Sequence, residues 1–226
     1  MTSPVSTTSL NQHAAEFDGA VADAIEAFPS ARLIQRVQDG SVTITHYHQI
    51  LVTLFPQTYD GPYSIALAAA RCSWEHEAAK EYLIAHAAEE HSHWRWALDD
   101  LASTGYRGPN PRDLFPHPSC EAYLSFVERV SERVPYARLA TASVLEGIAA
   151  AFGERYGRQL LQTLKLKPEQ ATFFLRHSET DQVHREEIAE AIASTPMTPH
   201  EWAWMKYVAT IAGKFYRAMY DHEAFI

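Results

Sequence analysis

Two segments of the chain repeat one pattern, in which an acidic residue stands four positions after one histidine and three positions before another. In an α-helix each residue turns by about 100°, so positions i, i+4 and i+7 lie on one face. Each segment therefore predicts two imidazoles and one carboxylate on the same helical face. The two triplets are His86, Glu90 and His93, and His177, Asp181 and His184.

These residue types are metal ligands. Imidazole and carboxylate together suit iron, manganese or zinc. If the two faces oppose each other, they would form a metal site inside a helix bundle. A solvated, charge-rich helix surface is the alternative interpretation for each triplet taken alone.

Local sequence distinguishes the two triplets. The second follows an apolar segment, 173–175, so its helix should face a core. In the first triplet, Glu89 and His91 are also possible ligands, so the sequence alone does not decide which acidic residue and which histidine belong to the pattern. Its Glu90 and His93 have the Glu-x-x-His spacing that di-iron bundles use.

Glu146 is the third informative residue. It is the only charged residue in the apolar segment LATASVLEGIAAAFG, residues 139–153. A buried carboxylate is costly unless it is paired, and a metal would pair it. The alternative is an ion pair with an arginine such as Arg138 or Arg155. Gly147 beside it could let another helix or a ligand approach closely.

Together these segments supply four imidazoles and three carboxylates, more than a mononuclear site needs. A dinuclear centre bridged by a carboxylate fits this supply. The donors are nitrogen and oxygen without thiolate, which favours iron or manganese over structural zinc.

The bulk composition indicates one acidic globular domain. The chain has 226 residues, 46% of them hydrophobic, and a formal net charge of -9. No basic cluster is present, so we expect neither a nucleic acid nor a membrane as partner. Cys72 and Cys120 are too few for a disulfide scaffold. The sequence shows no secretory signal and no membrane span, so we expect a cytoplasmic protein.

Helical patterns fill nearly the whole chain, which predicts an all-α protein of about seven to eight helices. The only β-like stretch is 42–45. We expect a disordered tail over residues 1–8 and a single helical domain over 9–226. The expected helices are about 9–28, 30–40, 45–71, 73–103, 119–132, 135–164, 168–194 and 198–223.

Several helix ends have local signals. Ser9 with Gln12 resembles a capping box, and Ser30 can cap the second helix. Pro56 should kink or break the third helix.

The first triplet should lie on one long helix, 73–103. Asp99 and Asp100, near its end, could hydrogen-bond a ligand imidazole. The Pro- and Gly-rich segment 104–118 reads as a surface loop and not as a domain linker, because each half of the chain holds only part of the ligand set.

The residues around the triplets resemble those of the heme-oxygenase-like di-iron oxidases, also described as iron-containing redox enzymes. That family has a Glu-x-x-His pair on one core helix, a lone Glu further on, and then His-x-x-x-Asp-x-x-His. The phrases HAAEEHSHWRWALDDL and VLEG are similar to the family as well, and the resemblance covers nearly the whole chain. It implies Glu90, His93, Glu146, His177, Asp181 and His184 as ligands.

One position departs from the family pattern. Some relatives have a carboxylate seven residues before the first helical histidine, where this chain has His86. His86 is therefore a seventh candidate ligand. The bridging carboxylate stays open, with Glu89 as an alternative to Glu90.

The resemblance implies a heme-oxygenase-like bundle and an O2-activating non-heme di-iron oxidase or oxygenase, with O2 as co-substrate. The substrate would be a small amine, amino-acid or fatty-acid-like molecule, and the outcome N-oxygenation, desaturation or oxidative C–C cleavage. The three histidines of the family pattern would be terminal ligands. Glu90, Glu146 and Asp181 would be catalytic carboxylates, terminal or bridging.

The sequence leaves several points open. A substrate carboxylate could pair with Arg71, Arg138 or Arg176.

An external electron donor and a homodimer are compatible with the sequence. The alternatives are a heme-degrading enzyme with His13 as axial ligand, a thiaminase-like enzyme with Cys72 as nucleophile, and a non-enzymatic metal-binding bundle.

Overall fold

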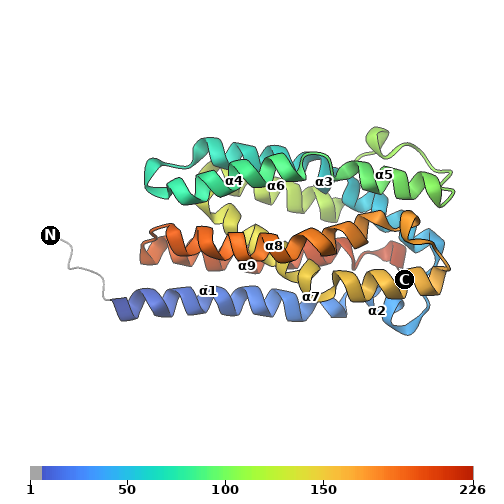
Figure 1. The fold of residues 1–226 in the computed structure, drawn as a ribbon, viewed down its shortest axis with the longest axis horizontal. Coiled ribbons are helices and arrows are strands. Elements are labelled where there is room, and N and C mark those ends of the chain that lie inside the picture. The colour runs from blue at the N-terminus through green and yellow to red at the C-terminus, as the bar shows by residue number, and fades with distance from the viewer. Residues whose placement is uncertain (1–6, 226) are drawn as a thin grey trace.

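The computed structural model describes the backbone of residues 7–225 and the side chains of residues 10–177 and 184–225. Over this part of the chain it contains nine α-helices and no β-strand. The helices run roughly along the long axis of an elongated bundle (Figure 1). The predicted all-α class is confirmed, and the second half of the β-like segment 42–45 already belongs to a helix.

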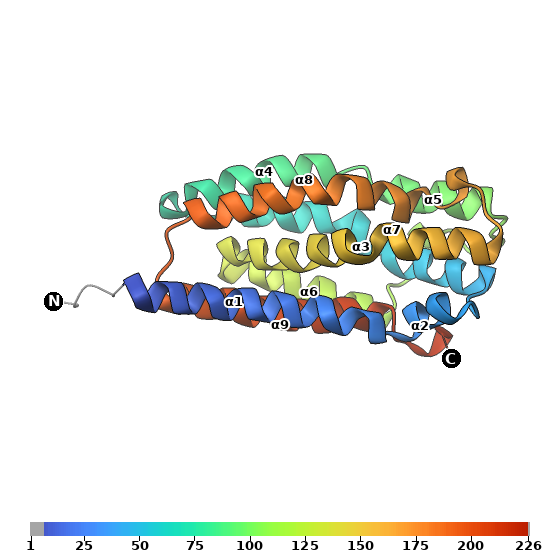
Figure 2. The same ribbon diagram turned by 60° about the horizontal axis from the view of Figure 1, so that its bottom comes forward.

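α7 lies in the middle of this bundle (Figure 2), between α8 and α4 on one side and α1 and α9 on the other. It therefore can contribute side chains to sites that several helices share. The helices are α1 Thr7–Ala27, α2 Arg32–Asp39, α3 Ile44–Arg71, α4 Glu77–Glu90, α5 Trp94–Ser103, α6 Pro118–Arg133, α7 Arg138–Leu164, α8 Thr172–Ser194 and α9 Pro199–Met219.

α3 is continuous through Pro56, so of the kink or break that the sequence predicted there, the break does not occur. Both Pro56 and Pro62 lie inside it. A proline inside a helix removes one backbone hydrogen bond and costs about 3 kcal/mol. Buried residues on both sides of Pro56, among them Leu54 and Ile65, hold the helix in the core and offset that cost.

The predicted long helix 73–103 is wrong in one respect, because it is interrupted at the first triplet. α4 ends at Glu90 and α5 begins at Trp94. The turn between them has tighter i to i+3 bonds, from His93 N to Glu90 O at 3.2 Å and from Trp96 N to His93 O at 3.0 Å. No Gly or Pro marks this turn in the sequence, so local signals could not have located it.

Two helix starts also differ from the prediction. Thr7, expected in a tail, already belongs to α1, while residues 1–6 lie outside the described part of the chain. Ser30 does not cap α2, because its Oγ donates to Ala27 O at 2.6 Å. Arg32 N instead donates to Asp221 Oδ1 at 3.1 Å, so a residue distant in sequence caps this helix.

Close helix packing brings α1 against α7. A Cβ built on Gly147 would lie 2.5 Å from Ile25 Cδ1. This confirms the expectation that Gly147 lets another helix approach. None of the described helices combines the length and apolar character that crossing a bilayer requires.

Candidate metal centre

The two triplets meet head to tail. The rings of His86 and His184 have centroids 5.2 Å apart, and those of His93 and His177 lie 5.0 Å apart. The first histidine of each triplet thus faces the last histidine of the other, as expected for antiparallel helices. The interrupted helix does not prevent this, because the turn after α4 keeps His93 directed toward α8.

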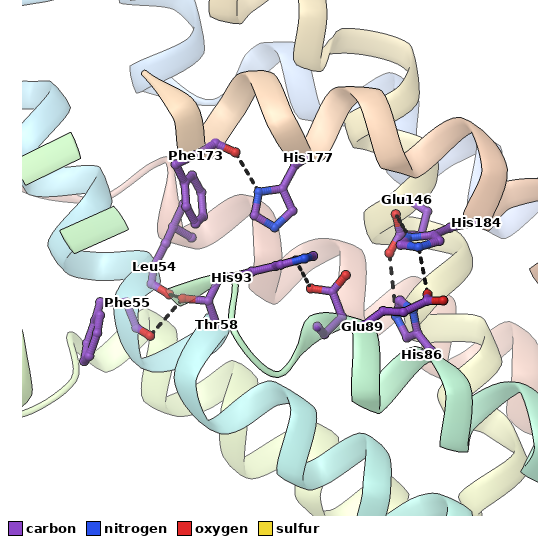
Figure 3. Close-up of polar contacts among 11 residues, drawn as sticks. Leu54, Phe55, Thr58, His86, Glu89, His93, Glu146, Phe173, His177 and His184 are labelled. Atoms are coloured by element: carbon purple, nitrogen blue, oxygen red, sulfur yellow. Dashed lines mark hydrogen bonds and ion pairs between the residues drawn. The ribbon is translucent and has the colours of Figure 1, made fainter. Parts of the chain in front are cut away.

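The first cluster contains two imidazoles and two carboxylates. Ligand atoms of His86, Glu90, Glu146 and His184 all lie within 4.8 Å of one another. Glu146 Oε1 is 3.7 Å from His86 Nε2, and its Oε2 is 3.6 Å from His184 Nδ1. In Figure 3 the Glu146 carboxylate faces both rings, while His177 lies closer to His93. The lone carboxylate of the apolar segment 139–153 therefore lies close to nitrogen donors of two histidines.

The second cluster contains Glu90, His93 and His177, whose ligand atoms also lie within 4.8 Å of one another. His93 Nδ1 donates to Glu90 Oε2 at 2.8 Å. His177 Nδ1 donates to the carbonyl of Phe173 at 2.6 Å. A carbonyl can only accept, so Nδ1 carries the proton and Nε2 is the nitrogen through which His177 would bind a metal.

Glu90 belongs to both clusters. A carboxylate that reaches two groups of donors has the position of a bridging ligand. Glu89 is placed differently, because its carboxylate side chain is 52% exposed and lies 3.1 Å from His184 Nε2. Glu89 thus faces a different group of potential ligands, with His184 and Glu187, and the choice between Glu89 and Glu90 as bridging carboxylate stays a prediction.

Asp181 lies on α8 between His177 and His184. Its side chain is outside the described residues, so its predicted role as a ligand stays a prediction.

The electrostatics of these side chains suit a cation. Burial lowers the pKa of His86 to about 4 and also lowers the pKa of His177. Burial raises the pKa of Glu90, but the hydrogen bond from His93 and the nearby imidazoles outweigh burial and bring its pKa to about 2. Near neutral pH the site therefore has the ionised Glu90 carboxylate beside the neutral imidazoles of His86 and His177, which are the protonation states that metal ligation requires.

One buried atom reinforces this fit. His86 Nδ1 is buried without a hydrogen-bond partner among the described side chains. Leaving a polar atom in this state costs free energy, and such atoms mark sites for a missing ion or water. The donor set and this unpaired atom both fit a resident metal.

Aromatic rings support the imidazoles. Trp96 stacks on His93 with centroids 4.0 Å apart, and Tyr82 stacks on His86 at 5.2 Å. The sequence analysis did not single out Tyr82, although its position four residues before His86 places both on one helical face.

Asp100 does not contact an imidazole, contrary to its predicted role. Its fully buried carboxylate accepts hydrogen bonds from Tyr47 Oη at 2.8 Å, from Thr172 N and Phe173 N at 2.9 Å each, and from Thr172 Oγ1 at 2.8 Å. It thereby anchors the first turn of α8. Asp99 is exposed.

The heme-degrading enzyme, the thiaminase-like enzyme and the Glu146–arginine ion pair each require a residue that belongs to neither cluster. His13 lies on α1, outside both clusters. Burial raises the pKa of the Cys72 thiol to about 11, which opposes a nucleophilic role at neutral pH. Within the described residues, Glu146 forms its ion pairs with histidines and Arg138 forms none, so the predicted Glu146–arginine alternative is not supported.

A separate group lies near the C-terminus. His117, His222 and Glu223 have potential ligand atoms within 4.8 Å of one another. The Glu223 carboxylate side chain is 79% exposed, and His117 caps α6 through Nδ1. His117 therefore has a helix-capping role, and His222 is buried with its Nε2 3.2 Å from Thr53 Oγ1.

Comparison with known proteins gives both a family and a fold. The model of a family described as iron-containing redox enzymes matches residues 49–203, which is more than half of the chain and includes both triplets and Glu146. Among curated proteins, none matches this sequence.

Solved structures share the fold over almost the whole chain. A domain of unknown function with a heme oxygenase-like fold from Shewanella denitrificans is 22% identical, with a TM-score of 0.80 over 96% of this chain and 91% of that one. A TenA homologue from Pseudomonas syringae is 16% identical, with a TM-score of 0.68 over 92% of this chain and 89% of that one. A CADD-like protein of unknown function from Nostoc punctiforme is 11% identical, with a TM-score of 0.71 over 92% and 97% of the two chains.

The predicted heme-oxygenase-like fold is confirmed by these structures. From the matched segment, the chain belongs to the family of iron-containing redox enzymes.

Proposed function

We propose that this protein is an O2-activating non-heme di-iron oxidase or oxygenase that acts on a small organic substrate. The observation that carries the proposal is the position of Glu90, whose carboxylate is common to two clusters of donors. A bridging carboxylate between two imidazole-bearing clusters is the arrangement that dinuclear carboxylate sites use in helix bundles.

Family membership supports iron as the metal, and the nitrogen and oxygen donors agree with it. Two bound Fe(II) ions would supply the electrons that activation of O2 requires. His86, Glu146 and His184 would hold one ion, His93 and His177 the other, and Glu90 both. We assign Asp181 to the same centre by its place in the second triplet.

The surrounding chain has three further tasks in this proposal. Buried helices around Glu146 exclude water from the site. The Phe173 carbonyl fixes the ring of His177 and its tautomer. The α4–α5 turn places His93 beside Glu90.

Iron stoichiometry tests the two-cluster arrangement. Anaerobic titration with Fe(II), read by metal analysis, should give about two irons per chain. We expect Glu90→Gln to weaken both sites, because it removes charge from the shared ligand. His86→Ala and His177→Ala should each lose about one iron, from opposite clusters.

Exposed neighbours provide matched controls for this titration. Glu81→Gln and His91→Ala change the same residue types at exposed positions and should keep about two irons. Loss of both irons in Glu89→Gln with retention in Glu90→Gln would contradict the assignment of the shared carboxylate.

Exposure of the Fe(II)-loaded protein to O2 tests the activity. We expect a transient visible absorbance that is absent in His184→Ala, and O2 consumption that increases with substrate. A non-enzymatic metal-binding bundle would bind iron without substrate-dependent O2 uptake. No iron uptake by the unaltered protein would end the proposal.

A further inference from the structure

Arg138 is a buried cation without a counter-ion in the described part of the chain. It is the first residue of α7 and is 5% exposed. Its Nη2 donates to Ser64 Oγ at 3.3 Å, and the Tyr123 side chain lies beside the guanidinium. Its Nε and Nη1 have no hydrogen-bond partner there. An unpaired buried guanidinium is costly, and an anion that accepts from these two nitrogens would offset the cost.

A small cavity of about 60 Å³ adjoins this guanidinium. Thr141, one turn along α7, also lines it and has a buried hydroxyl without a partner among described residues. The same cavity is lined by His86, Glu90 and Glu146. A bound anion would therefore lie next to the candidate metal centre.

A second cavity of about 120 Å³ is also lined by Glu90 and Glu146 and is mostly apolar. It follows one face of α7 through Ala149, Phe152 and Leu160. From Glu146 to Leu160 this face extends about 20 Å, at 1.5 Å per residue. The only ionisable acidic or basic groups of its described lining, apart from histidine and tyrosine, are the two glutamates.

One face of α7 thus carries three regions in series: a cation, the metal-ligand cluster and an apolar groove. Arg138 and Glu146 are about 12 Å apart along the helix axis, a distance that the long arginine side chain partly covers. A molecule occupying both cavities would pass the Glu90 and Glu146 carboxylates.

We propose that the substrate is a carboxylic acid with an apolar chain, whose carboxylate binds Arg138 and Thr141 and whose chain lies along α7. This inference rests on the proposed function and narrows its substrate class. It selects Arg138 from the arginines that the sequence left open, since Arg71 is exposed and Arg176 lies over the Trp96 ring at 5.5 Å. A cationic amine head is disfavoured, because Arg138 would repel it.

Equilibrium binding without turnover tests the proposal. Decanoate, decylamine and decanol are titrated by calorimetry into the anaerobic Fe(II)-loaded chain and into the metal-free chain. Decanoate should bind at least about tenfold more tightly than the other two, since only it can accept charge-assisted hydrogen bonds. Arg138→Gln should weaken decanoate roughly 10- to 100-fold and leave decanol unchanged.

The site for the apolar chain of the ligand is tested separately from the site for its carboxylate. Ala149→Phe places a larger side chain in the apolar groove and should weaken decanoate more than hexanoate. Arg71→Gln, which removes an exposed arginine, should leave every affinity unchanged. If Arg138→Gln has lost its helical circular dichroism, Arg138→Lys keeps the charge and should retain part of the preference for decanoate over decanol.

The outcomes separate this inference from the di-iron proposal. A chain that binds iron but binds decanoate no better than decanol, or equally well in Arg138→Gln, would overturn the substrate assignment alone. Arg138-dependent decanoate binding by a chain that takes up no iron would support the anion site and overturn the di-iron function.

Discussion

At the scale of single residues, the protonation of a few side chains decides what the site can do. His93 donates Nδ1–H to Glu90 at 2.8 Å. A metal bound by both residues through these atoms would replace that proton, so metal binding should release protons. His177 donates Nδ1–H to the Phe173 carbonyl, so its Nε2 would bind a metal without loss of that proton. The two rings of the second cluster are therefore prepared for a metal to different degrees.

Cys72 provides a residue-scale test of the thiaminase-like alternative. Burial raises the pKa of its thiol to about 11, so little thiolate is present at neutral pH. We expect alkylation by iodoacetamide to be slow at pH 8 and to accelerate as the pH approaches 11. Cys72→Ser should keep iron uptake and O2 consumption. Rapid alkylation at pH 7, or loss of both activities in Cys72→Ser, would contradict this prediction.

At the scale of the elements, Asp100 connects α5 to the start of α8. Its carboxylate accepts from the backbone of Thr172 and Phe173 and from the hydroxyl of Tyr47. Phe173 in turn holds His177 through its carbonyl. A residue that contacts neither candidate metal site thus positions one of the ligands through the helix on which it lies.

Asp100→Ala should therefore have two measurable effects. Because buried donors would be left without an acceptor, the free energy of unfolding in urea should fall by about 2 to 4 kcal/mol. Iron affinity of the second cluster should fall about tenfold or more, because the support of His177 is lost. Asp99→Ala, at the exposed neighbouring position, should change neither quantity. Unchanged urea stability in Asp100→Ala would contradict the capping role.

At the scale of the whole molecule, the C-terminal segment closes one end of the bundle. His222 Nε2 lies 3.2 Å from Thr53 Oγ1 on α3, and its ring stacks on His117 with centroids 4.0 Å apart. His117 caps α6. A histidine near the end of the chain therefore joins segments far apart in sequence.

This contact predicts a pH dependence of stability. Burial and the neighbouring His117 lower the pKa of His222 from 6.5 to about 4, although Glu223 and Asp221 act in the opposite direction. Between these values the unfolded chain binds more protons than the folded chain, so stability falls as the pH drops from 6.5 to 4 and is fully present above 6.5.

Thermal unfolding checks that dependence. His222→Gln removes the titration, so its melting temperature should fall less than that of the unaltered protein between pH 7 and pH 5. His200→Gln, at an exposed position, should behave like the unaltered protein. An equal fall in His222→Gln and in the unaltered protein would show that other groups control the acid sensitivity.

The helical class and most of the candidate site could be predicted from the sequence, because the patterns that indicate them are local or follow the helical repeat. The spacing His-x-x-x-acid-x-x-His depends only on helical geometry, and it placed both triplets on faces that meet. The lone charge of Glu146 in an apolar helix indicated a buried partner. The all-α class followed from periodicity throughout the chain.

Other features depended on which helices pack together. The continuity of α3 through Pro56 and the capping of α8 by Asp100 depend on packing and contacts between segments distant in sequence. Local propensity cannot report such contacts, because tertiary packing outweighs terms of a few kcal/mol.

By itself, the sequence determined which donors are available and which of them share a helical face, because the helical repeat is the same in every helix. Only the tertiary structure decided that Glu90 belongs to both clusters and that Arg138 is buried beside them without a counter-ion. Those relations require distances between helices, and such distances depend on how the side chains of the whole bundle pack.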